Sequence, residues 1–403
     1  MAGDLALASR PEVRTGELPL TLEVFTDLAA VEGIWREMER SGVCSPYQRF
    51  DWIRLYAATV LAAEDASTCV VLVRHGKSEL LLLPLAVHNR RGLRTASPIG
   101  GKQANYHVPV MAPGAAALLP PEAMQQLLCA AAAEAKVDMF AFHNLPLAWR
   151  GERNPLVLPG ATSSPSHAPK TPLPADAETL LGQVGTSEAR RKLRRKEAGL
   201  SALGELTYCR AQNPKEADTI LEAFFRQKNE RFRDLGIASP FDDEASRHFI
   251  RAACLVGLER GQPAIELHGL SLDGRVIATY GGAADAERFS CMFNSFDQSP
   301  EIARFSPGDI LLTHLIRAQC GLGRTVLDLG VGEARYKRLF CKDAEELVDV
   351  FLPVTVTGRL CGLALEQLVT AKRYVKQTPS LWSLVQAMRA GRSKLGSLTA
   401  GLF

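Results

Sequence analysis

The stretch Thr325–Phe340, with the sequence TVLDLGVGEARYKRLF, constrains the fold more than any other part of the chain. It begins as a β-branched apolar run that ends at Gly330 and Gly332, and a polar, aromatic and basic segment follows at once. Glycine has no Cβ and adopts positive φ, so a strand that ends in this way can bring its backbone close to a ligand. A tight turn with a solvated basic tip explains the same residues equally well.

Length and charge limit the class of protein. A chain of 403 residues is longer than one ordinary hydrophobic core, which predicts two domains. Hydrophobic residues make up 46% and charged residues 23%, a profile typical of soluble globular proteins. The 47 basic and 44 acidic residues leave a net charge of +3, which is too balanced for nucleic acid or an anionic membrane to be the main partner.

Cysteine spacing and apolar runs indicate the compartment. The nine cysteines include no CxxC pair, so we expect neither a metal site nor a disulfide framework. Residues 1–18 lack the apolar segment of a signal peptide and are predicted to form a disordered leader. The longest apolar run, Leu80–Val87, is far shorter than the ~20 residues of a membrane helix. We therefore expect a cytoplasmic protein without membrane insertion.

The two halves of the chain repeat in the order of their elements. Ser45-Pro46-Tyr47 corresponds to Ser239-Pro240-Phe241 at an offset of roughly 194 residues, and similar strands follow each segment. This order predicts an α/β (α+β) protein with two similar domains, each a mixed, mostly antiparallel sheet flanked by helices. The expected boundaries are 19–165 for the first domain, 166–186 for a linker, 187–356 for the second domain and 357–403 for a helical extension.

The segment Phe305–Leu312 has the features of a helix start. Pro307 takes the first helical position after Ser306, and Gly308 permits close approach of a ligand. Free N–H groups in such a first turn, aided by the helix dipole, can bind a pyrophosphate. Asp309 argues against a simple anion site because it already supplies negative charge, and a capped core helix is the commoner explanation.

Two further segments are candidates for binding. Six of the seven residues of Arg190–Lys196 are cationic, with like charges at i,i+4 spacing, which suggests either a solvated face or a compensating anion. No aromatic residues interleave with these charges, which weakens the case for RNA. His107 in Asn105-Tyr106-His107 titrates near neutral pH and is a candidate base, although a lone histidine is more often structural.

Four segments together resemble the CelD-type (cellulose-biosynthesis-associated) branch of the GNAT acyltransferase superfamily, which is related in fold to the FemAB aminoacyl transferases. They are the helix Ser187–Arg195, the helix with Lys228 and Arg231, Ser306–Leu312 and Asp328–Phe340. The resemblance covers roughly residues 180–345. It implies two tandem GNAT-like domains, the first of them degenerate, and acyl transfer from acyl-CoA, with acetyl-CoA as the first choice.

The resemblance also implies where the site lies. The donor pyrophosphate would bind at the helix start, formed by Ser306, Pro307, Gly308, Asp309 and Ile310. The catalytic candidates are Asp328 or Glu333 as the base, Tyr336 as the acid for the leaving thiolate and Lys337 as a charge stabiliser. The acceptor would contact Tyr106, His107, Arg231, Gly330 and Gly332. Ser306–Asp309 departs from the Arg/Gln-x-x-Gly-x-Gly/Ala loop of ordinary GNATs.

The leading prediction is an N-acyltransferase that acts on an amine of a sugar or a cell-envelope or exopolysaccharide precursor. The first alternative is a FemAB-type transferase that uses aminoacyl-tRNA, with Arg190–Lys196 facing the RNA. The second is a non-catalytic scaffold of a polysaccharide-biosynthesis system, in which Tyr336 and Lys337 dock a partner.

Overall fold

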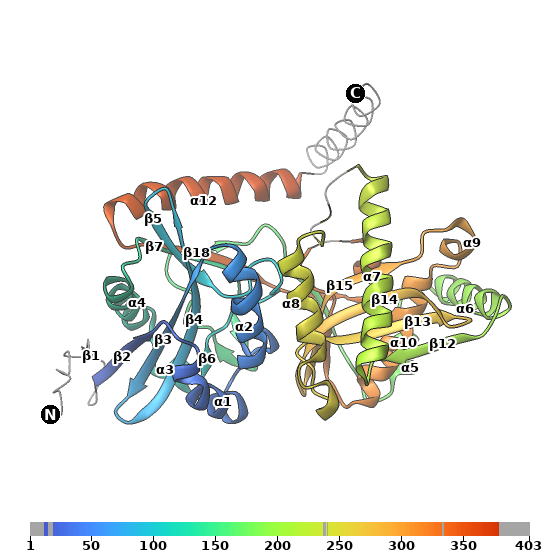
Figure 1. The fold of residues 1–403 in the computed structure, drawn as a ribbon, viewed down its shortest axis with the longest axis horizontal. Helices are drawn as coiled ribbons and strands as arrows, with labels where there is room; N and C mark the ends of the chain where they lie inside the picture. Colours follow the sequence, from blue (N-terminus) through green and yellow to red (C-terminus); the bar gives the residue numbers. More distant parts are fainter. Residues whose placement is uncertain (1–11, 15–18, 237–238, 240, 333, 379–403) are drawn as a thin grey trace, which may run out of the picture. The chain divides into compact units, whose positions relative to one another are not determined.

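The computed structural model describes residues 12–14, 19–236, 239, 241–332 and 334–378, which form two compact units (Figure 1). The first unit contains the chain up to Ser164 together with Glu346–Thr370, and the second contains Pro165–Glu345 and the residues after Thr370. Among the described residues, no helix is both long and apolar enough to cross a membrane.

The first unit is built on one large sheet. Its strands are β1 (Glu12–Arg14), β2 (Pro19–Phe25), β3 (Ser67–His75), β4 (Ser78–Arg90), β5 (Leu93–Pro98), β6 (Val110–Met111), β7 (Met139–Pro146), β10 (Thr162–Ser163) and β18 (Leu347–Pro353). Within the described residues, their order is β1-β2-β3-β4-β5-β7-β18-β10, with β6 paired to β4. Two short strands, β8 (Ala148–Trp149) and β9 (Glu152–Arg153), pair separately.

Helices accompany both sheets. In the first unit they are η1 (Ala29–Val31), α1 (Glu32–Ser41), η2 (Pro46–Gln48), α2 (Phe50–Tyr56), the π-helical η3 (Ala57–Leu61), α3 (Ala115–Leu118) and α4 (Pro121–Ala135). The central strands β3 and β4 are buried along most of their length, because their apolar runs face helices on both sides. A last helix, α12 (Val356–Gln377), follows β18 and packs Cys361 and Leu365 against Met139, Ala141 and Phe351.

The second unit repeats this plan. Its strands are β11 (Ala168–Pro172), β12 (Leu206–Arg210), β13 (Glu266–Leu272), β14 (Arg275–Ala284), β15 (Arg288–Phe296), β16 (Val326–Asp328) and β17 (Asp343–Glu345). Its helices are α5 (Ala177–Leu181), α6 (Ser187–Ser201), α7 (Pro214–Asp234), α8 (Glu244–Leu255), η4 (Leu258–Arg260), α9 (Pro300–Ala303), α10 (Pro307–Gly321) and α11 (Arg335–Phe340). The strand order is β12-β13-β14-β15-β16-β11-β17.

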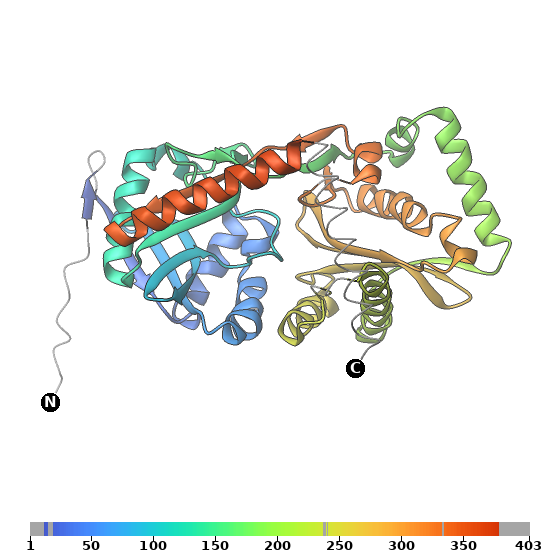
Figure 2. The same cartoon turned by 90° about the horizontal axis from the view of Figure 1, so that it is seen from above.

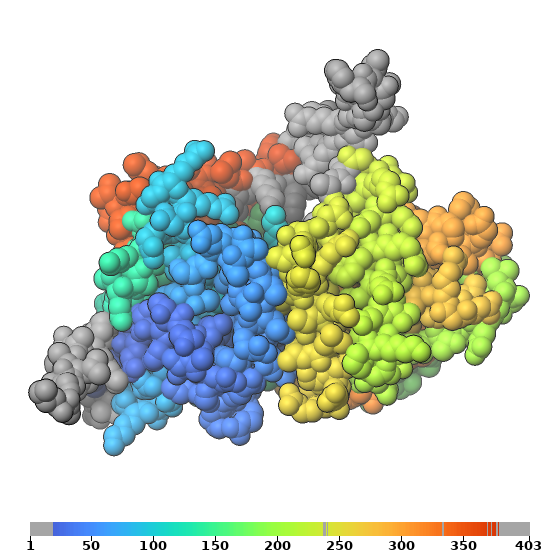
Figure 3. All heavy atoms as spheres, in the orientation of Figure 1, coloured from blue at the N-terminus to red at the C-terminus, as the bar shows by residue number. Residues whose placement is uncertain are grey.

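Helices cover both faces of the second sheet. Figure 2 shows α7 and α8 on one side of β13–β15, and α10 and α6 on the other. Figure 3 looks onto the first of these sides, where the side chains of α7 and α8 cover the strands. Ile310, Leu311 and Ile316 of α10 belong to one buried cluster with Leu270 of β13 and Ile277 of β14. The prediction of two α/β units with mostly antiparallel, helix-flanked sheets is confirmed.

Each sheet contains one parallel contact at the same place in its order. In the first unit β5 pairs with β7 in parallel, and in the second β15 pairs with β16 in parallel. The strands on either side of these pairs are antiparallel to them. The shared order supports the internal repeat, since β2–β5 and β7 occupy the same positions as β12–β15 and β16.

The domain boundaries expected from the sequence differ from the structure at two places. β18 was expected in the second domain, but it pairs with β7 of the first sheet. Residues 166–186 were expected to form a linker, but they contain α5 and the strand β11, which pairs with β16 and β17. β18 therefore comes from outside the contiguous segment that forms the other strands of the first unit, whereas β11 belongs to the contiguous segment Pro165–Glu345 of the second unit. Most of the expected leader and residues 379–403 of the expected extension lie outside the described residues.

Candidate functional site

The parallel pair of the second sheet opens toward one end. β15 and β16 are paired at only three positions, where Arg288–Ser290 face Val326–Asp328. Beyond Ser290, β15 continues to Phe296 with β14 as its partner, while β16 stops at Asp328. The chain after β15 forms α9 and then α10, and the chain after β16 turns into α11. The two helices α10 and α11 therefore begin near the end at which the strands part.

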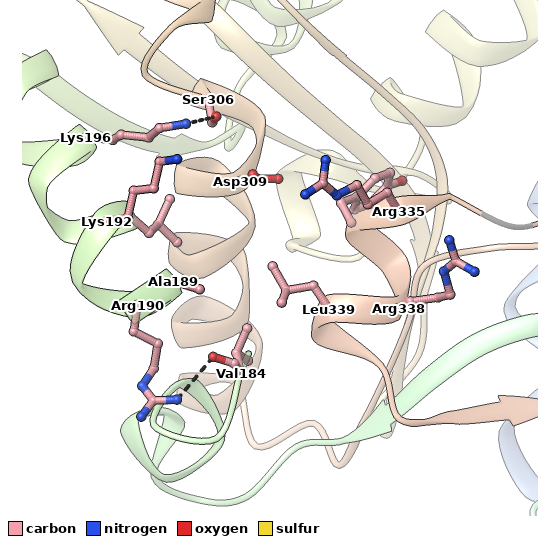
Figure 4. Close-up of a pocket in the computed structure, with 12 residues that line it drawn as sticks. Val184, Ala189, Arg190, Lys192, Lys196, Ser306, Asp309, Arg335, Arg338 and Leu339 are labelled. Carbon is pink, nitrogen blue, oxygen red and sulfur yellow. Dashed lines mark hydrogen bonds between the residues drawn. The ribbon is translucent and has the colours of Figure 1, made fainter. Parts of the chain in front are cut away.

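A cavity of about 810 Å³ lies beside the start of α10 (Figure 4). Its walls come from α6, α10 and α11 and from the segment before α6. The described residues that line it are Val184, Ala189, Arg190, Lys192, Leu193, Lys196, Ser306, Asp309, Arg335, Tyr336, Arg338 and Leu339. Five of these side chains are cationic and one is a carboxylate. This composition favours an anionic ligand, because clustered like charges are stabilised by an opposite charge between them.

The start of α10 is held in a strained conformation. Ser306 adopts a left-handed backbone with φ 55° and ψ 57°, which is uncommon for a residue with a Cβ. Lys196 Nζ donates a hydrogen bond to Ser306 Oγ at 2.6 Å, so α6 is tied to this turn. Pro307 then takes the first helical position. Such strain persists where the surroundings fix it, and here it places the first turn of a 15-residue helix at the cavity.

Asp309 is the one carboxylate among the described residues that line the cavity. Burial raises its pKa above the ordinary value for aspartate, and the nearby charges of Lys196 and Arg335 act in the opposite direction. A partly buried carboxylate with a raised pKa can hold a proton at a pH where an exposed aspartate cannot. The arrangement suits a proton acceptor better than a phosphate ligand.

Tyr336 of α11 lines the cavity and contacts β15. Asn294 Nδ2 of β15 donates a hydrogen bond to the Tyr336 hydroxyl at 3.0 Å. Burial raises the pKa of Tyr336 well above its usual value of 10, so the hydroxyl is protonated at neutral pH. A buried, protonated phenol that lines an open cavity can donate a proton to a leaving group.

The turn between β16 and α11 explains the glycines of the quoted stretch. Gly330 and Gly332 have φ of 77° and 101°, a region that favours glycine. Asp328 Oδ1 accepts hydrogen bonds from Ser290 Oγ at 2.9 Å and from the Gly330 N–H at 3.1 Å. Arg288 lies 3.6 Å from Asp328 Oδ2. Asp328 is fully buried and is not among the residues that line the cavity, so its geometry favours positioning of this turn over the expected role of a base.

Lys337 also closes this turn. Its Nζ donates hydrogen bonds to the carbonyl oxygens of Gly330 at 2.8 Å and Val331 at 3.4 Å. The side chain is buried, and burial lowers its pKa below the ordinary value for lysine. It is not among the residues that line the cavity, so the expected role of charge stabiliser is not favoured by its position. Glu333, the other expected base, lies outside the described residues.

The remaining expected site residues are not among the described residues that line the cavity. Pro307 and Ile310 are buried on the core side of α10, and Gly308 is partly exposed. Arg231 is exposed on α7, with its guanidinium 6.0 Å from the centre of the Phe296 ring. Tyr106 and His107 belong to the first unit and are buried there, and burial lowers the pKa of His107 to about 3. A histidine with this pKa is neutral near pH 7 and stays so, which does not suit the expected acceptor contact.

The loop that carries His107 fills the place in the first unit where its parallel strands part. The His107 N–H donates to the Asn144 carbonyl at 3.3 Å, and Asn154 Nδ2 donates to the His107 carbonyl at 3.1 Å. Tyr106 packs against Trp149 with ring centres 5.2 Å apart. These contacts join the loop to β7 and to the segment after it.

Sequence reasoning missed part of the cavity wall. Arg335 and Arg338 lie in the quoted stretch but were not chosen, because a basic tip is equally typical of a solvated turn. The charge run on α6 divides into two faces. Arg190, Lys192 and Lys196 line the cavity, whereas Arg191, Arg194 and Arg195 do not. The i,i+4 repetition of like charge was the available signal for this wall.

Comparison with known proteins agrees with the fold. Residues 187–338 match the model of the acetyltransferase (GNAT) domain. A conserved protein of unknown function from Bacteroides thetaiotaomicron VPI-5482 is similar over 82% of this chain and 99% of its own, with 13% identity and a TM-score of 0.53. FemX is similar over 84% of this chain and 100% of its own, with 11% identity and a TM-score of 0.56. No curated protein matches the sequence.

The domain match covers the strands β15 and β16, the helices α6 and α10, and the part of α11 up to residue 338. It lies within the second unit, and the first unit shares its strand order. The protein is therefore an acyltransferase with two units of the GNAT fold.

Proposed function

We propose that this acyltransferase moves an acetyl group from acetyl-CoA to the amine of a sugar or of a similar cell-envelope precursor. The observation that carries the proposal is the cavity at the start of α10, where cations from α6 and α11 meet Tyr336 and Asp309. The sugar part rests on the resemblance of Ser187–Arg195 and Asp328–Phe340 to the CelD-type branch. The anionic phosphates of the donor supply the negative charge that the cations require.

The donor phosphates fit the cationic half of the wall. Lys192 and Lys196 project from α6 beside the first turn of α10, and Arg335 of α11 lies beside Asp309, whereas the Arg338 side chain points away from α10 (Figure 4). Charged hydrogen bonds to phosphate are stronger than neutral ones, and the helix N-terminus adds a favourable dipole. Asp309 opposes this attraction, which places the phosphates toward α6 and α11 and leaves the carboxylate for the acceptor.

The chemical step uses one proton acceptor and one proton donor of the cavity wall. The acceptor nitrogen forms a bond to the thioester carbon, and the C–S bond breaks. The acceptor ammonium loses two protons. One passes through Asp309 to solvent. The other restores the proton of Tyr336, which Tyr336 has donated to the departing thiolate. The products are an amide, the CoA thiol and one proton. Asp309 acts as the base and Tyr336 as the acid.

Removing the two lysines of the cavity wall is expected to weaken donor binding. We expect Lys192→Gln with Lys196→Gln to raise the Kd for acetyl-CoA about 10- to 100-fold, because each lost charged contact is worth on the order of 1 kcal/mol or more. Isothermal titration calorimetry with acetyl-CoA and with CoA measures the change. The matched control is Arg191→Gln with Arg195→Gln, which removes two exposed cations at the same spacing on the same helix.

The control variant should keep the wild-type Kd within about threefold, since exposed charges contribute little. If both variants weaken binding equally, the attraction is general and the cavity is not the donor site. Absence of acetyl-CoA binding by the wild-type protein contradicts the proposed donor directly.

Asp309→Asn is expected to lower kcat about 100-fold and to leave acetyl-CoA binding unchanged or slightly tighter. The amide cannot accept the ammonium proton, whereas loss of a negative charge favours the phosphates. Activity depends on the deprotonated carboxylate, so wild-type kcat should rise with pH through a pKa above that of an ordinary aspartate. A panel of amino sugars with a thiol-release assay gives kcat. A variant that keeps the rising limb and the rate would remove Asp309 as the base.

The exposed face of α6 favours one second candidate, a transferase that uses aminoacyl-tRNA. Arg191, Arg194 and Arg195 form a cationic stripe away from the cavity. If RNA binds there, the glutamine variant of Arg191 and Arg195 should lose salt-dependent tRNA binding, while the variant of Lys192 and Lys196 keeps it. The two variant pairs thus separate the two donors.

A further inference from the structure

The last helix of the chain has apolar side chains on two opposite faces. On one face Cys361 and Leu365 pack against the first sheet, and Gly358 lies so close to it that a Cβ would come within 2.1 Å of the Asp138 carbonyl. Thr355 at the helix start donates to Asp138 Oδ1 at 2.8 Å. This face therefore fixes α12 on the first unit, and the helix is described from Val356 to Gln377.

The opposite face is apolar and exposed. Among the described residues, eleven large apolar side chains are exposed, and five of them lie on α12. On this face the exposed fractions are 76% for Val356, 69% for Leu360, 61% for Leu363 and 65% for Tyr374, and Leu368, 65% exposed, lies to one side of it. Figure 2 looks onto α12 from its outer side. A concentration of exposed apolar groups on one helix is unusual for a surface that faces only water.

The spacing of these residues is that of a coiled coil. Val356, Leu360 and Leu363 are followed on the same face by Gln367, Thr370 and Tyr374, at successive intervals of four, three, four, three and four residues. Alternation of four and three defines the a and d positions of a heptad, which pack against a second helix of the same kind. All six residues are exposed. Leu368 lies outside this seam.

The polar and charged residues of α12 select a second copy of the same helix. Gln367 occupies a core position, where a polar side chain pairs with its own copy across a two-fold axis and fixes the register. Beside the seam lie the charged residues Arg359, Glu366 and Arg373 on one side and the small residues Thr357, Ala364 and Ala371 on the other. In a parallel pair each charged side chain lies over a small residue of the partner helix.

An antiparallel pair with full overlap of the seam is disfavoured by the same charges. It brings Glu366 opposite its own copy and Arg359 opposite the second copy's Arg373, and like charges at these positions are repulsive. We propose that the outer face of α12 is a homodimer interface, formed by parallel, in-register pairing of the seam Val356, Leu360, Leu363, Gln367, Thr370 and Tyr374 with a second copy of this chain. The pairing is independent of the cavity in the second unit.

The test is the mass of the full chain in solution. Sedimentation velocity and light scattering over a range of concentrations should give twice the chain mass of 43.8 kDa. Leu360→Glu with Leu363→Glu should return the mass to one chain or raise the dimer Kd at least tenfold. Leu368→Glu is the matched control, because it places the same charge at an equally exposed leucine outside the seam. It should leave the dimer intact.

Two further variants test the register and the direction. Gln367→Leu should tighten the dimer, because it removes a polar group from the seam. Leu360→Cys should give a disulfide between two copies of position 360 under mild oxidation, located by peptide mapping, since only a parallel in-register pair brings these positions together. The circular dichroism spectrum of each variant should match the wild type, because the substituted side chains are exposed in the single chain.

Other occupants of the face give different results. A chain that remains a monomer at all concentrations overturns the proposal, and so does a dimer that survives the double glutamate substitution. If the monomer instead sediments with vesicles of anionic and neutral phospholipid, and the double substitution abolishes this, the face binds a membrane surface. A disulfide between position 360 and a residue near the opposite end of α12 overturns the parallel arrangement.

Discussion

Tyr336→Phe is expected to lower kcat for acetyl transfer about 1,000-fold while acetyl-CoA binds within about threefold of the wild type. The departing thiolate needs a proton, and loss of a positioned general acid typically costs 10²- to 10⁴-fold in rate. The Tyr336 hydroxyl is held by Asn294 at 3.0 Å, and burial keeps it protonated. Phenylalanine keeps the ring in the cavity wall, so the donor should still bind. Thiol release with the best amino-sugar acceptor gives kcat, and calorimetry gives the Kd.

The control for this variant is Tyr208→Phe. Tyr208 lies in the same unit, its hydroxyl hydrogen-bonds to His268 Nδ1 at 2.8 Å, and burial raises its pKa as it does for Tyr336. It does not line the cavity. Both variants lose one partly buried hydrogen bond, so both should lose about 1 kcal/mol of stability. A kcat for Tyr336→Phe within tenfold of that for Tyr208→Phe would exclude proton donation by Tyr336.

Local signals predicted most elements of the second unit. The helix with Lys228 and Arg231 begins at Pro214, because Asn213 accepts a hydrogen bond from the Glu216 N–H and Pro214 takes the first helical position. The expected helix at Ser187 has a cap at Thr186, which accepts from the Ala189 N–H. Such caps are encoded within four residues, so a sequence pattern reveals them without knowledge of the rest of the fold.

The sheets to which β18 and β11 belong could not be predicted in the same way. The apolar run at Leu347–Pro353 predicts a strand. Its pairing with β7 depends on residues about 200 positions earlier in the chain. Position in the sequence therefore assigned β18 to the wrong unit. Similarly, residues 166–186 were expected to form a linker, whereas β11 completes the second sheet beside β16.

The cavity lies in the part of the chain where the sequence predicts the site, and the chemical roles of its residues stay a prediction. The sequence marks the region around Asp328 and Tyr336, yet it does not show which side chains face inward. The Asp328 carboxylate accepts hydrogen bonds from Ser290 Oγ and the Gly330 N–H and lies close to Arg288. Lys337 donates hydrogen bonds to two carbonyl oxygens. Asp309 was expected to contact the donor and instead supplies the carboxylate of the wall. Orientation is set by tertiary contacts, which a single sequence does not reveal.

Arg324→Met is expected to destabilise the second unit by about 3 kcal/mol at pH 7. Glu266 of β13 is buried, and Arg324 holds both of its carboxylate oxygens, one of them at 2.9 Å from Nη1. Removing one partner of a buried ion pair leaves a charge without solvation, which typically costs 3–5 kcal/mol. Arg210 still lies 3.1 Å from Glu266, which keeps the loss near the lower end of that range. Hydrogen exchange of the β13 and β14 amides measures the opening free energy of this unit directly.

The effect of Arg324→Met should shrink at low pH. Burial alone would raise the pKa of Glu266, but hydrogen bonds and charge from His268 and Arg324 outweigh it and hold the pKa well below the ordinary 4.5. A carboxyl with a depressed folded-state pKa stabilises the fold above its unfolded pKa, and this contribution is lost as pH falls below it. The wild-type advantage is therefore complete at pH 7 and diminishes below about pH 4.5. Arg275→Met is the control, since Arg275 is 57% exposed and its pair with Asp297 should contribute less than about 1 kcal/mol. Equal losses for the two variants would show that the buried pair contributes no more than the exposed one.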